Sequence, residues 1–463
     1  MSSLTSEQQL TQFAAQVRAD RLPPVVIAKL KELVLDSIGV ALAGSTAPGV
    51  DAILTPVREW GGKPLSSVIG HAFQAPPPLV ALANGMMGTA RDFDDTLDDA
   101  MLHTQPSVLY STLALAEARG CSGADMLAAL AAGTEMQCRM GHARLRGQEF
   151  LPTGTTGGIA AAAACARVIG MPAERLIDAC GIAYSQCASN VQPLREFATV
   201  KRFHAGFAAK VGVLSTVLAE GGLTGAHRFL EGEFGYYRLY EMGAYLPGPL
   251  TEGLGEKWHL LQLSLKPYPS GRDNHGAVEA ALLLRKENRI SPENIERVDV
   301  WLPPNAFGVA GYPWGSLGGH PVVEAVISAS YCVAVALAKG RLTLDDMTPE
   351  AVADATVQTL ARKVHCHKLT DGVDEITFVP QKVEVTTTDG HRYGHEVTDY
   401  MLGHPSHPLS RAQVLQKFHD CIRFAARPAS DEIAQRLIAA VDHLEELPDA
   451  GVIGRLVSLA KSE

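Results

Sequence analysis

The amino-acid sequence predicts a mainly α-helical protein with a smaller α+β domain. From about residue 23 to residue 263 the apolar residues recur at helical spacing, and no strand pattern appears. Period-two alternation begins only after residue 265, and helical spacing returns after residue 408. We therefore expect a large helical domain made of residues 1–265 and 401–463, and a smaller α+β domain made of residues 266–400.

The individual elements follow from the same patterns. In the large domain we expect helices at residues 25–43, 79–89, 107–119, 123–140, 159–168, 173–187, 204–220, 409–425 and 430–444. In the smaller domain we expect helices at residues 274–285, 322–338 and 349–364, and strands at residues 295–302, 382–388 and 391–397. Gly44-Ser45 and Gly221-Gly222 are helix-end signals, and Asp389-Gly390 is a hairpin turn.

Length and charge limit the classes of function. The chain has 463 residues, enough for two domains, and a formal net charge of −10. This charge argues against nucleic acid or an anionic membrane surface as a partner. The first 20 residues lack the layout of a secretory signal, and no apolar run is long enough to span a bilayer. None of the eight cysteines forms a CxxC pair, so we expect a reducing, cytoplasmic location.

The most informative stretch is residues 91–103, called here the acidic segment. Five acids fall within eight residues, between apolar and small-residue flanks. Carboxylates placed among buried helices cost free energy unless they are paired or used. His103 suits proton transfer near neutral pH, Asp92 can orient it, and Thr96 can hydrogen-bond a substrate oxygen. The alternative interpretation is that the carboxylates cap helix N-termini, which we expect for Asp98 and Asp99.

Two further clusters carry cations. Lys201 and Arg202 precede a helix of small residues, and a helix N-terminus beside cations binds carboxylates well. Lys266, Arg272 and His275 lie on a Pro- and Gly-containing loop at the expected domain junction, a common place for ligand sites. The alternatives are a basic surface turn and an ordinary linker.

The remaining motifs are weaker. The turn that begins at Thr153 could hold an anion on its backbone N–H groups, although close helix packing explains it better. It lacks the lysine of a P-loop and follows no strand, so we reject nucleotide binding. His365-Cys366-His367 has no partner cluster at ligand spacing. We predict no metal and no cofactor, and infer proton transfer beside a substrate carboxylate that cations neutralise.

These motifs together resemble the MmgE/PrpD family, which includes 2-methylcitrate dehydratase, cis-aconitate decarboxylase and iminodisuccinate epimerase. The resemblance rests on Asp92-Phe-Asp-Asp-Thr96 with His103, Pro152-Thr-Gly-Thr-Thr-Gly-Gly, Lys201-Arg-Phe-His-Ala-Gly206, Leu223-Thr-Gly225, Lys266-Pro-Tyr-Pro-Ser-Gly-Arg with His275, and Pro408-Leu-Ser with Lys417-Phe418. It implies a two-domain fold, a homodimer, and a metal-free site in the cleft between the domains.

The resemblance also assigns roles to residues. By similarity to the decarboxylases of the family, the expected catalytic residues are Asp92, Thr96, His103, Lys201 and Lys266. The sequence departs from the family pattern where Leu151 replaces a common His, and where Ser270-Gly271-Arg272 replaces a Cys or Ala-His step. The segment from Thr96 to His103 is also about one residue longer than in the family pattern. These departures leave the substrate and the reaction open.

Three functions remain open as predictions. The first is a cofactor-independent lyase, a dehydratase or decarboxylase, that acts on a small di- or tricarboxylate of the citrate or aconitate type. The second is an epimerase or isomerase that uses the same site, and the third is a non-catalytic carboxylate-binding protein. In the lyase, His103 is the principal acid/base. The residues expected to bind substrate are Arg272, Arg202, His275 and Thr153, in addition to Lys201 and Lys266.

Overall fold

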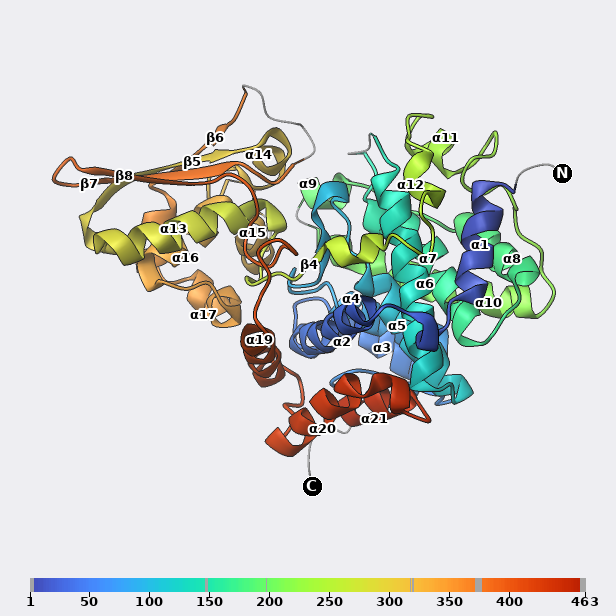
Figure 1. Cartoon of the computed structure of the whole chain (residues 1–463). Coiled ribbons are helices and arrows are strands. Elements are labelled where there is room, and N and C mark those ends of the chain that lie inside the picture. Colours follow the sequence, from blue (N-terminus) through green and yellow to red (C-terminus); the bar gives the residue numbers. More distant parts are fainter. Residues whose placement is uncertain are drawn as a thin grey trace.

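The computed structural model describes residues 4–145, 149–196, 198–316, 318, 320–370 and 377–458. Figure 1 shows a large helical part and a smaller part in which helices cover a sheet, which confirms the predicted fold class. The buried apolar residues form two main clusters. One contains residues between positions 10 and 265 and between 409 and 457, and the other contains residues between 277 and 401. The exact domain limits stay a prediction.

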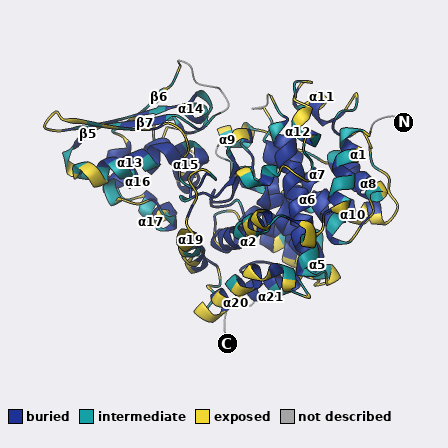
Figure 2. Cartoon of the chain, in the orientation of Figure 1, coloured by how far each residue is buried: buried dark blue, intermediate teal, exposed yellow. Residues whose placement is uncertain are grey.

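The large part has a buried centre of packed helices. Its helices are α1 (Ser6–Gln16), α2 (Pro24–Gly44), α3 (Asp51–Trp60), α4 (Pro77–Met87), α5 (Gln105–Arg119), α6 (Gly123–His142), α7 (Pro152–Val168), α8 (Ala173–Tyr184), α9 (Gln192–Arg195), α10 (His204–Glu220), α11 (Tyr236–Tyr240) and α12 (Gly248–Thr251). Helices α4, α5, α6, α7 and α10 contact one another, and Figure 2 shows α6 and α7 buried along most of their length. Small residues permit the close approach, since a Cβ at Gly212 of α10 would lie 2.4 Å from the Cβ of Ala161 on α7.

The C-terminal helices pack against the large part. They are α19 (Arg411–Arg423), α20 (Asp431–Asp442) and α21 (Gly451–Ser458). Helix α19 lies on α2, and α21 lies on α5. One polar contact fixes the first of these pairs, because Lys417 of α19 places its Nζ 2.7 Å from Oδ1 of the fully buried Asp36 on α2.

The smaller part is a four-stranded sheet with helices. The strand order is β6-β5-β7-β8. Strand β5 (Ile295–Leu302) is parallel to β6 (Val364–Lys368) and antiparallel to β7 (Gln381–Thr387), which pairs with β8 (Arg392–Val397). The helices are α13 (His275–Asn288), α14 (Pro304–Ala310), α15 (Pro321–Ile327), α16 (Ala329–Lys339), α17 (Pro349–Val352) and α18 (Ala355–Ala361). Helices α13 and α16 lie against one face of the sheet (Figure 1).

Some predicted elements of the smaller part are wrong. The helix expected at residues 349–364 is two short helices, and Val364 begins strand β6, whose pairing with β5 overrides the helical pattern. The helix expected at residues 322–338 bends by 82° between α15 and α16. The break falls at Ser328, whose side chain accepts a hydrogen bond from Tyr331 N and so begins a new helix.

The large part also differs in detail from the prediction. Helix α7 begins at Pro152, seven residues before the expected start, because proline suits the first helical turn. Helix α1 was not predicted, although Thr5 and Gln8 form a capping box. No strand was expected here, yet two short pairs occur: β1 (Ser66–Ser67) with β2 (Gln74–Ala75), and β3 (Thr96–Leu97) with β4 (Leu263–Ser264).

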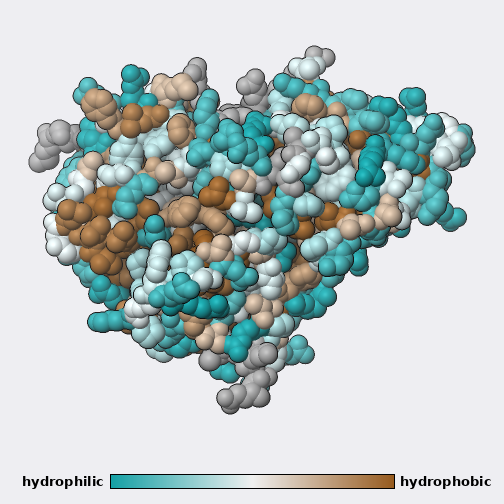
Figure 3. Space-filling view, turned by 180° about the vertical axis from the view of Figure 1, so that it is seen from behind, coloured by the Kyte–Doolittle hydropathy of each residue, from teal (hydrophilic) through white to brown (hydrophobic). Residues whose placement is uncertain are grey.

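The surface of the large part carries exposed apolar side chains. Phe207, Val217 and Leu218 of α10 and the nearby Leu223 are 38 to 51% exposed. Figure 3 shows a broad hydrophobic area on the side of the large part that faces away in Figure 1. Within the described residues, no single helix is long and apolar enough to cross a membrane; only the bent pair α15–α16 meets that test by length and composition.

Candidate active site

The pair of short strands β3 and β4 brings two distant motifs together. Thr96 pairs with Ser264 across this ladder, 168 positions apart in sequence. The acidic segment therefore runs beside the chain that leads to Lys266. The 3₁₀ helix η3 (Thr199–Phe203) carries Lys201 to the same place, since Lys201 contacts Asp92.

Asp92 is the centre of a buried charge cluster. Its Oδ2 lies 2.9 Å from Nζ of Lys201, and its Oδ1 lies 2.9 Å from Nζ of Lys266. Burial opposes ionisation of this carboxyl, but Lys201, Lys266 and His103 outweigh it and hold the pKa of Asp92 well below its usual range. The backbone is unusual as well, because Asp92 has a φ of +52°. Such conformations are rare outside glycine and concentrate at functional sites.

Lys266 is buried more deeply than Lys201. Its side chain is 0% exposed, whereas that of Lys201 is 24% exposed. Lys266 also donates to the backbone O of Asp92, and its Nζ lies 4.0 Å from Oδ1 of Asp94. Burial disfavours the ammonium form, but the two carboxylates raise the pKa of Lys266 above its ordinary value. Lys266 therefore holds Asp92 in place, while Lys201 keeps surface that a ligand can contact.

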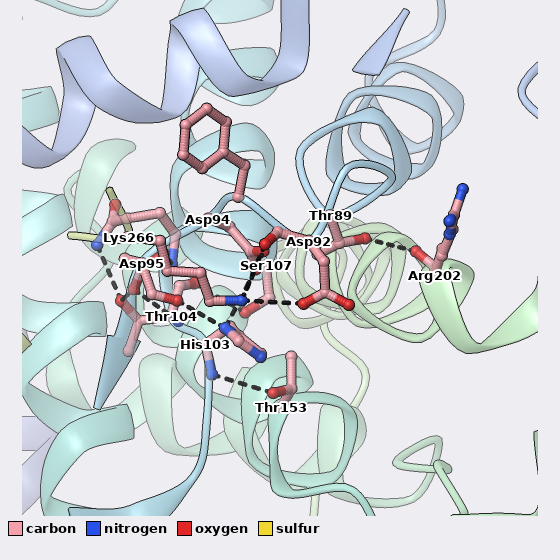
Figure 4. A network of polar contacts seen from close by, with 12 residues as sticks. Thr89, Asp92, Asp94, Asp95, His103, Thr104, Ser107, Thr153, Arg202 and Lys266 are labelled. Atoms are coloured by element: carbon pink, nitrogen blue, oxygen red, sulfur yellow. Dashed lines mark hydrogen bonds and ion pairs between the residues drawn. The ribbon is translucent and has the colours of Figure 1, made fainter. Parts of the chain in front are cut away.

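The ring of His103 is oriented through Nδ1. This atom lies 2.6 Å from the backbone O of Asp95 and 3.2 Å from Oδ2 of Asp94. Because a carbonyl oxygen only accepts, Nδ1 carries the proton, and Nε2 is the basic atom of the neutral ring. Figure 4 shows this network, with Asp94 and His103 close together.

The backbone of His103 is fixed by neighbouring helices. Its N–H donates to Oγ1 of Thr153 on α7 at 3.0 Å, and its O accepts from Nε2 of Gln137 on α6 at 3.2 Å. Figure 4 shows Thr153 beside His103. The structure thus gives Thr153 a contact with the backbone of His103 that the sequence did not predict, and its predicted contact with substrate stays a prediction.

Asp95 acts as the helix cap that we considered for the acidic segment. Its carboxylate accepts from the backbone N–H groups of Thr104 and Gln105 and from the Thr104 hydroxyl, at 2.7 to 3.1 Å. These groups begin α5, so a negative charge here is favourable. Burial, with the nearby Asp94 charge, raises the pKa of Asp95. Asp95 therefore contacts the His103 ring through its backbone O and the start of a buried helix through its carboxylate.

One cavity of about 130 Å³ is lined by all five predicted catalytic residues and by Arg272. Its polar lining includes Asp92, Thr96, His103, Lys201, Lys266, Arg195, Arg272, Asp273 and Asn305. Its apolar lining includes Met101, Phe150, Leu151, Val191, Leu194, Val309, Ile327 and Phe378. A second hollow of about 60 Å³ shares Asp92, His103 and Lys201 and extends to Arg202, His204 and Thr153. The cavity therefore has a charged wall and an apolar wall.

Arg272 lines the cavity but is already paired, and His275 is absent from the lining of the cavity. Arg272 donates to both carboxylate oxygens of Asp98 at 2.8 to 3.2 Å and to the backbone O of Leu402 at 2.9 Å. Asp98 therefore pairs with Arg272, whereas we expected it to cap a helix N-terminus. His275 is fully buried between Arg272 and the backbone O of Ser270, and burial holds its pKa well below the ordinary value. Their predicted contact with substrate stays a prediction.

Arg202 is buried, with only 5% of its surface exposed. Its Nη1 has no hydrogen-bond partner among the described residues. Burial lowers the pKa of Arg202, while the Asp92 charge partly restores it. Its backbone O accepts from the Thr89 hydroxyl at 2.6 Å. A guanidinium left partly unpaired at the smaller hollow can receive an anion.

Sequence reasoning missed several residues of the site. Asp94, which contacts His103, and Asp273 and Asn305, which line the cavity, were not assigned roles. Lys417 was also missed, although its Nζ donates to the backbone O of Phe93 at 2.9 Å and lies 3.9 Å from the centre of that ring. Asp273 lies inside the Lys266–His275 motif, so its position in the sequence could have indicated that it belongs to the site. Within the described residues no group of three or more His, Cys, Asp or Glu side chains could hold a metal ion.

Two family models match the chain. The MmgE/PrpD N-terminal domain matches residues 8–246, and the MmgE/PrpD C-terminal domain matches residues 268–444. The chain belongs to the MmgE/PrpD family. The predicted resemblance is thereby confirmed.

Named relatives are enzymes of one class. The chain is 28% identical over 460 residues to cis-aconitate decarboxylase of Mus musculus, and the match covers 95% of this chain and 91% of that protein. It is 26% identical over 475 residues to cis-aconitate decarboxylase of Aspergillus terreus, covering 96% and 94%. It is 24% identical over 393 residues to 2-methylcitrate dehydratase of Salmonella typhimurium, covering 80% of each. Decarboxylases and dehydratases of this kind are lyases.

Proposed function

We propose that this protein is a lyase that removes CO₂ from a small unsaturated tricarboxylate such as cis-aconitate, using only its own side chains. The observation that carries the proposal is the shared cavity, in which His103 Nε2, the Asp92–Lys201 pair and buried Lys266 meet an apolar wall. Two relatives that match 95% and 96% of the chain carry the name cis-aconitate decarboxylase, whereas the 2-methylcitrate dehydratase matches 80%, which supports this substrate over other carboxylates.

The proposed step is a decarboxylation with a shift of the double bond. The bond between the substrate carbon and the departing carboxylate breaks, and its electron pair forms a new double bond. The electrons of the old double bond take the proton from Nε2–H of protonated His103 at the far carbon. The products are CO₂, a dicarboxylate and neutral His103, which regains a proton from water. Asp94, 3.2 Å from Nδ1, stabilises the protonated ring before this transfer.

The two walls of the cavity have separate tasks in this step. Lys201, with 24% of its side chain exposed, and Arg202 of the adjoining second hollow bind the carboxylates that remain in the product. The apolar wall, which includes Leu151, Leu194 and Ile327, surrounds the departing carboxylate. A carboxylate removed from water loses hydration, and neutral CO₂ does not, so an apolar wall favours the product.

The test is turnover by the purified protein. Incubation of cis-aconitate in D₂O should release CO₂ and give a dicarboxylate with one deuterium at the carbon that accepts the proton, observed by NMR. Lys201→Met should raise KM because it removes a carboxylate ligand. Failure of the wild-type protein to convert cis-aconitate, citrate or 2-methylcitrate would contradict the proposal.

A dehydratase is the second candidate. One relative carries the name 2-methylcitrate dehydratase, and the same histidine could exchange a proton beside a carboxylate while a hydroxyl leaves. Loss of water without CO₂ from a citrate-type acid would identify it. Deuterium exchange with neither loss would instead indicate an epimerase, and tight binding without turnover would indicate a binding protein.

We also propose, from the family resemblance, that the chain forms a homodimer. The exposed apolar residues of α10 support this, because large apolar patches on a folded protein mark interaction sites. Sedimentation analysis should give twice the chain mass of 49.3 kDa. Val217→Lys should shift the population toward monomer, and a monomeric wild-type protein would contradict the proposal.

A further inference from the structure

A second acidic side chain lines the cavity. Asp273 belongs to the 3₁₀ helix η5 (Arg272–Asn274) and lines the cavity of about 130 Å³ together with Asp92, His103 and Lys201. Its Oδ1 is buried and has no hydrogen-bond partner among the residues that the structure describes. Buried carboxylate oxygens are almost always hydrogen-bonded in folded proteins. A partner is therefore expected from a bound molecule or from a proton on the carboxyl itself.

The backbone around Asp273 is fixed, so the carboxyl cannot simply turn to solvent. Its backbone O accepts from Nε2 of Gln381 at 2.9 Å. On one side Arg272 is held by Asp98, and on the other side Asn274 donates to the backbone O of Ile327 at 2.8 Å. These contacts join η5 to the acidic segment, to β7 and to α15. The carboxyl is therefore presented to the cavity by a rigid support.

Gly271 keeps the space beside this carboxyl open. A Cβ built at Gly271 would lie 3.5 Å from Oδ2 of Asp273. Gly271 and Asp273 both line the cavity, so a larger side chain at position 271 would crowd this carboxyl. The absence of a side chain leaves Asp273 accessible to a ligand.

The charges around Asp273 favour its neutral form. Burial raises the pKa of Asp273 to about 6, and the Asp92 charge adds to this effect, while the backbone N–H of Asp273 itself, Lys266 and Lys201 oppose it. The other charged or titratable groups along the cavity are His103, Arg195 and Arg272, and Arg272 is already paired with Asp98. An anionic substrate would add negative charge to the same space. Proton uptake by Asp273 would then accompany binding.

We propose that Asp273 binds the substrate as a neutral carboxylic acid and donates a hydrogen bond from its O–H to a substrate carboxylate oxygen. This inference rests on the proposed function, since it requires a carboxylate in the cavity. It makes Asp273 a specificity-determining residue, because a ligand without an acceptor there leaves the O–H unpaired. The proton comes from water and returns to water when the product leaves, so the overall reaction is unchanged.

The test compares binding of propane-1,2,3-tricarboxylate, a saturated analogue, at pH 7.0 and pH 8.0 by calorimetry. The full-length wild type should bind about tenfold more weakly at the higher pH, because one proton must be taken up by a group whose pKa lies below this range. Asp273→Asn keeps a neutral N–H donor and should change by less than about twofold. Asp99→Asn removes one charge from an exposed position outside the cavity and should keep the wild-type pH dependence.

Proton uptake by the wild type is a second test that needs no variant. Calorimetry at pH 7.5 in two buffers with different ionisation enthalpies should show close to one proton taken up per ligand bound. Equal pH dependence in Asp273→Asn and wild type, or no proton uptake, would overturn the role of Asp273 while leaving the proposed function intact. Absence of any tricarboxylate binding by the wild type would overturn both.

Discussion

Lys201 and Lys266 form a natural comparison of a buried and a partly exposed ion pair. Both place Nζ 2.9 Å from the same Asp92 carboxylate, but their side chains are 24% and 0% exposed. Lys→Met at either position keeps a similar length of side chain and removes the charge. Any difference in stability between the two variants therefore reports the effect of burial.

The expected magnitudes differ several-fold. Removing one partner of a fully buried pair costs about 3–5 kcal/mol, so Lys266→Met should lose this much, because Asp92 and Asp94 stay buried beside it. Fully exposed pairs contribute about 0.2–1 kcal/mol, and Lys201 is partly exposed, so Lys201→Met should lose less than Lys266→Met. The assay is urea unfolding followed by circular dichroism at pH 7.5. Equal losses in the two variants would refute the claim that Lys266 supports the acidic segment from within the core.

Three further predictions concern the groups around the site. Thr153→Val should leave the His103 N–H unpaired and lower kcat more than it raises KM. Thr153→Ser keeps the hydroxyl and should retain activity. A change in KM alone would instead indicate a direct contact between Thr153 and the substrate. Lys417→Met should destabilise the protein by about 3–5 kcal/mol, because it leaves the buried Asp36 carboxylate unpaired. The double variant Asp36→Leu, Lys417→Met should recover most of this loss in thermal unfolding, since replacing both buried charges is often neutral. No recovery would contradict the pairing. Because the pKa of Asp92 is lowered in the folded protein, its contribution to stability is complete above about pH 4 and is lost as the pH falls through the folded-state pKa. The free energy of unfolding should therefore fall less steeply with decreasing pH in Asp92→Asn. The same acid dependence in the variant and the wild type would refute this.

The sequence was sufficient to locate the segments that form the site. Asp92, His103, Lys201 and Lys266 were selected because charged residues among small and apolar ones need partners, and the structure places them around one cavity. The fold class could be predicted for the same reason, since helical and period-two patterns follow directly from which faces are buried.

The details that orient the site could not be read from the sequence. His103 is oriented by the backbone O of Asp95, and every residue has such an oxygen, so no side-chain pattern reveals it. Arg272 is paired with Asp98 across 174 positions, and a free guanidinium and a paired one look the same in sequence. Strand β6 was not predicted, and its first residue, Val364, was taken as the end of a helix, because its pairing partner Val298 on β5 lies 66 positions earlier. In each case the deciding contact is tertiary.

The most direct test of the account is the steady-state rate of CO₂ release from cis-aconitate by wild type and His103→Gln. The backbone contacts of His103 to Thr153 and Gln137 remain in the variant, so it should fold normally and keep the wild-type melting temperature within a few degrees. Its kcat should fall by about 10²–10⁴-fold, as expected for loss of one general acid. A variant that releases CO₂ at the wild-type rate would contradict the proposed role of His103.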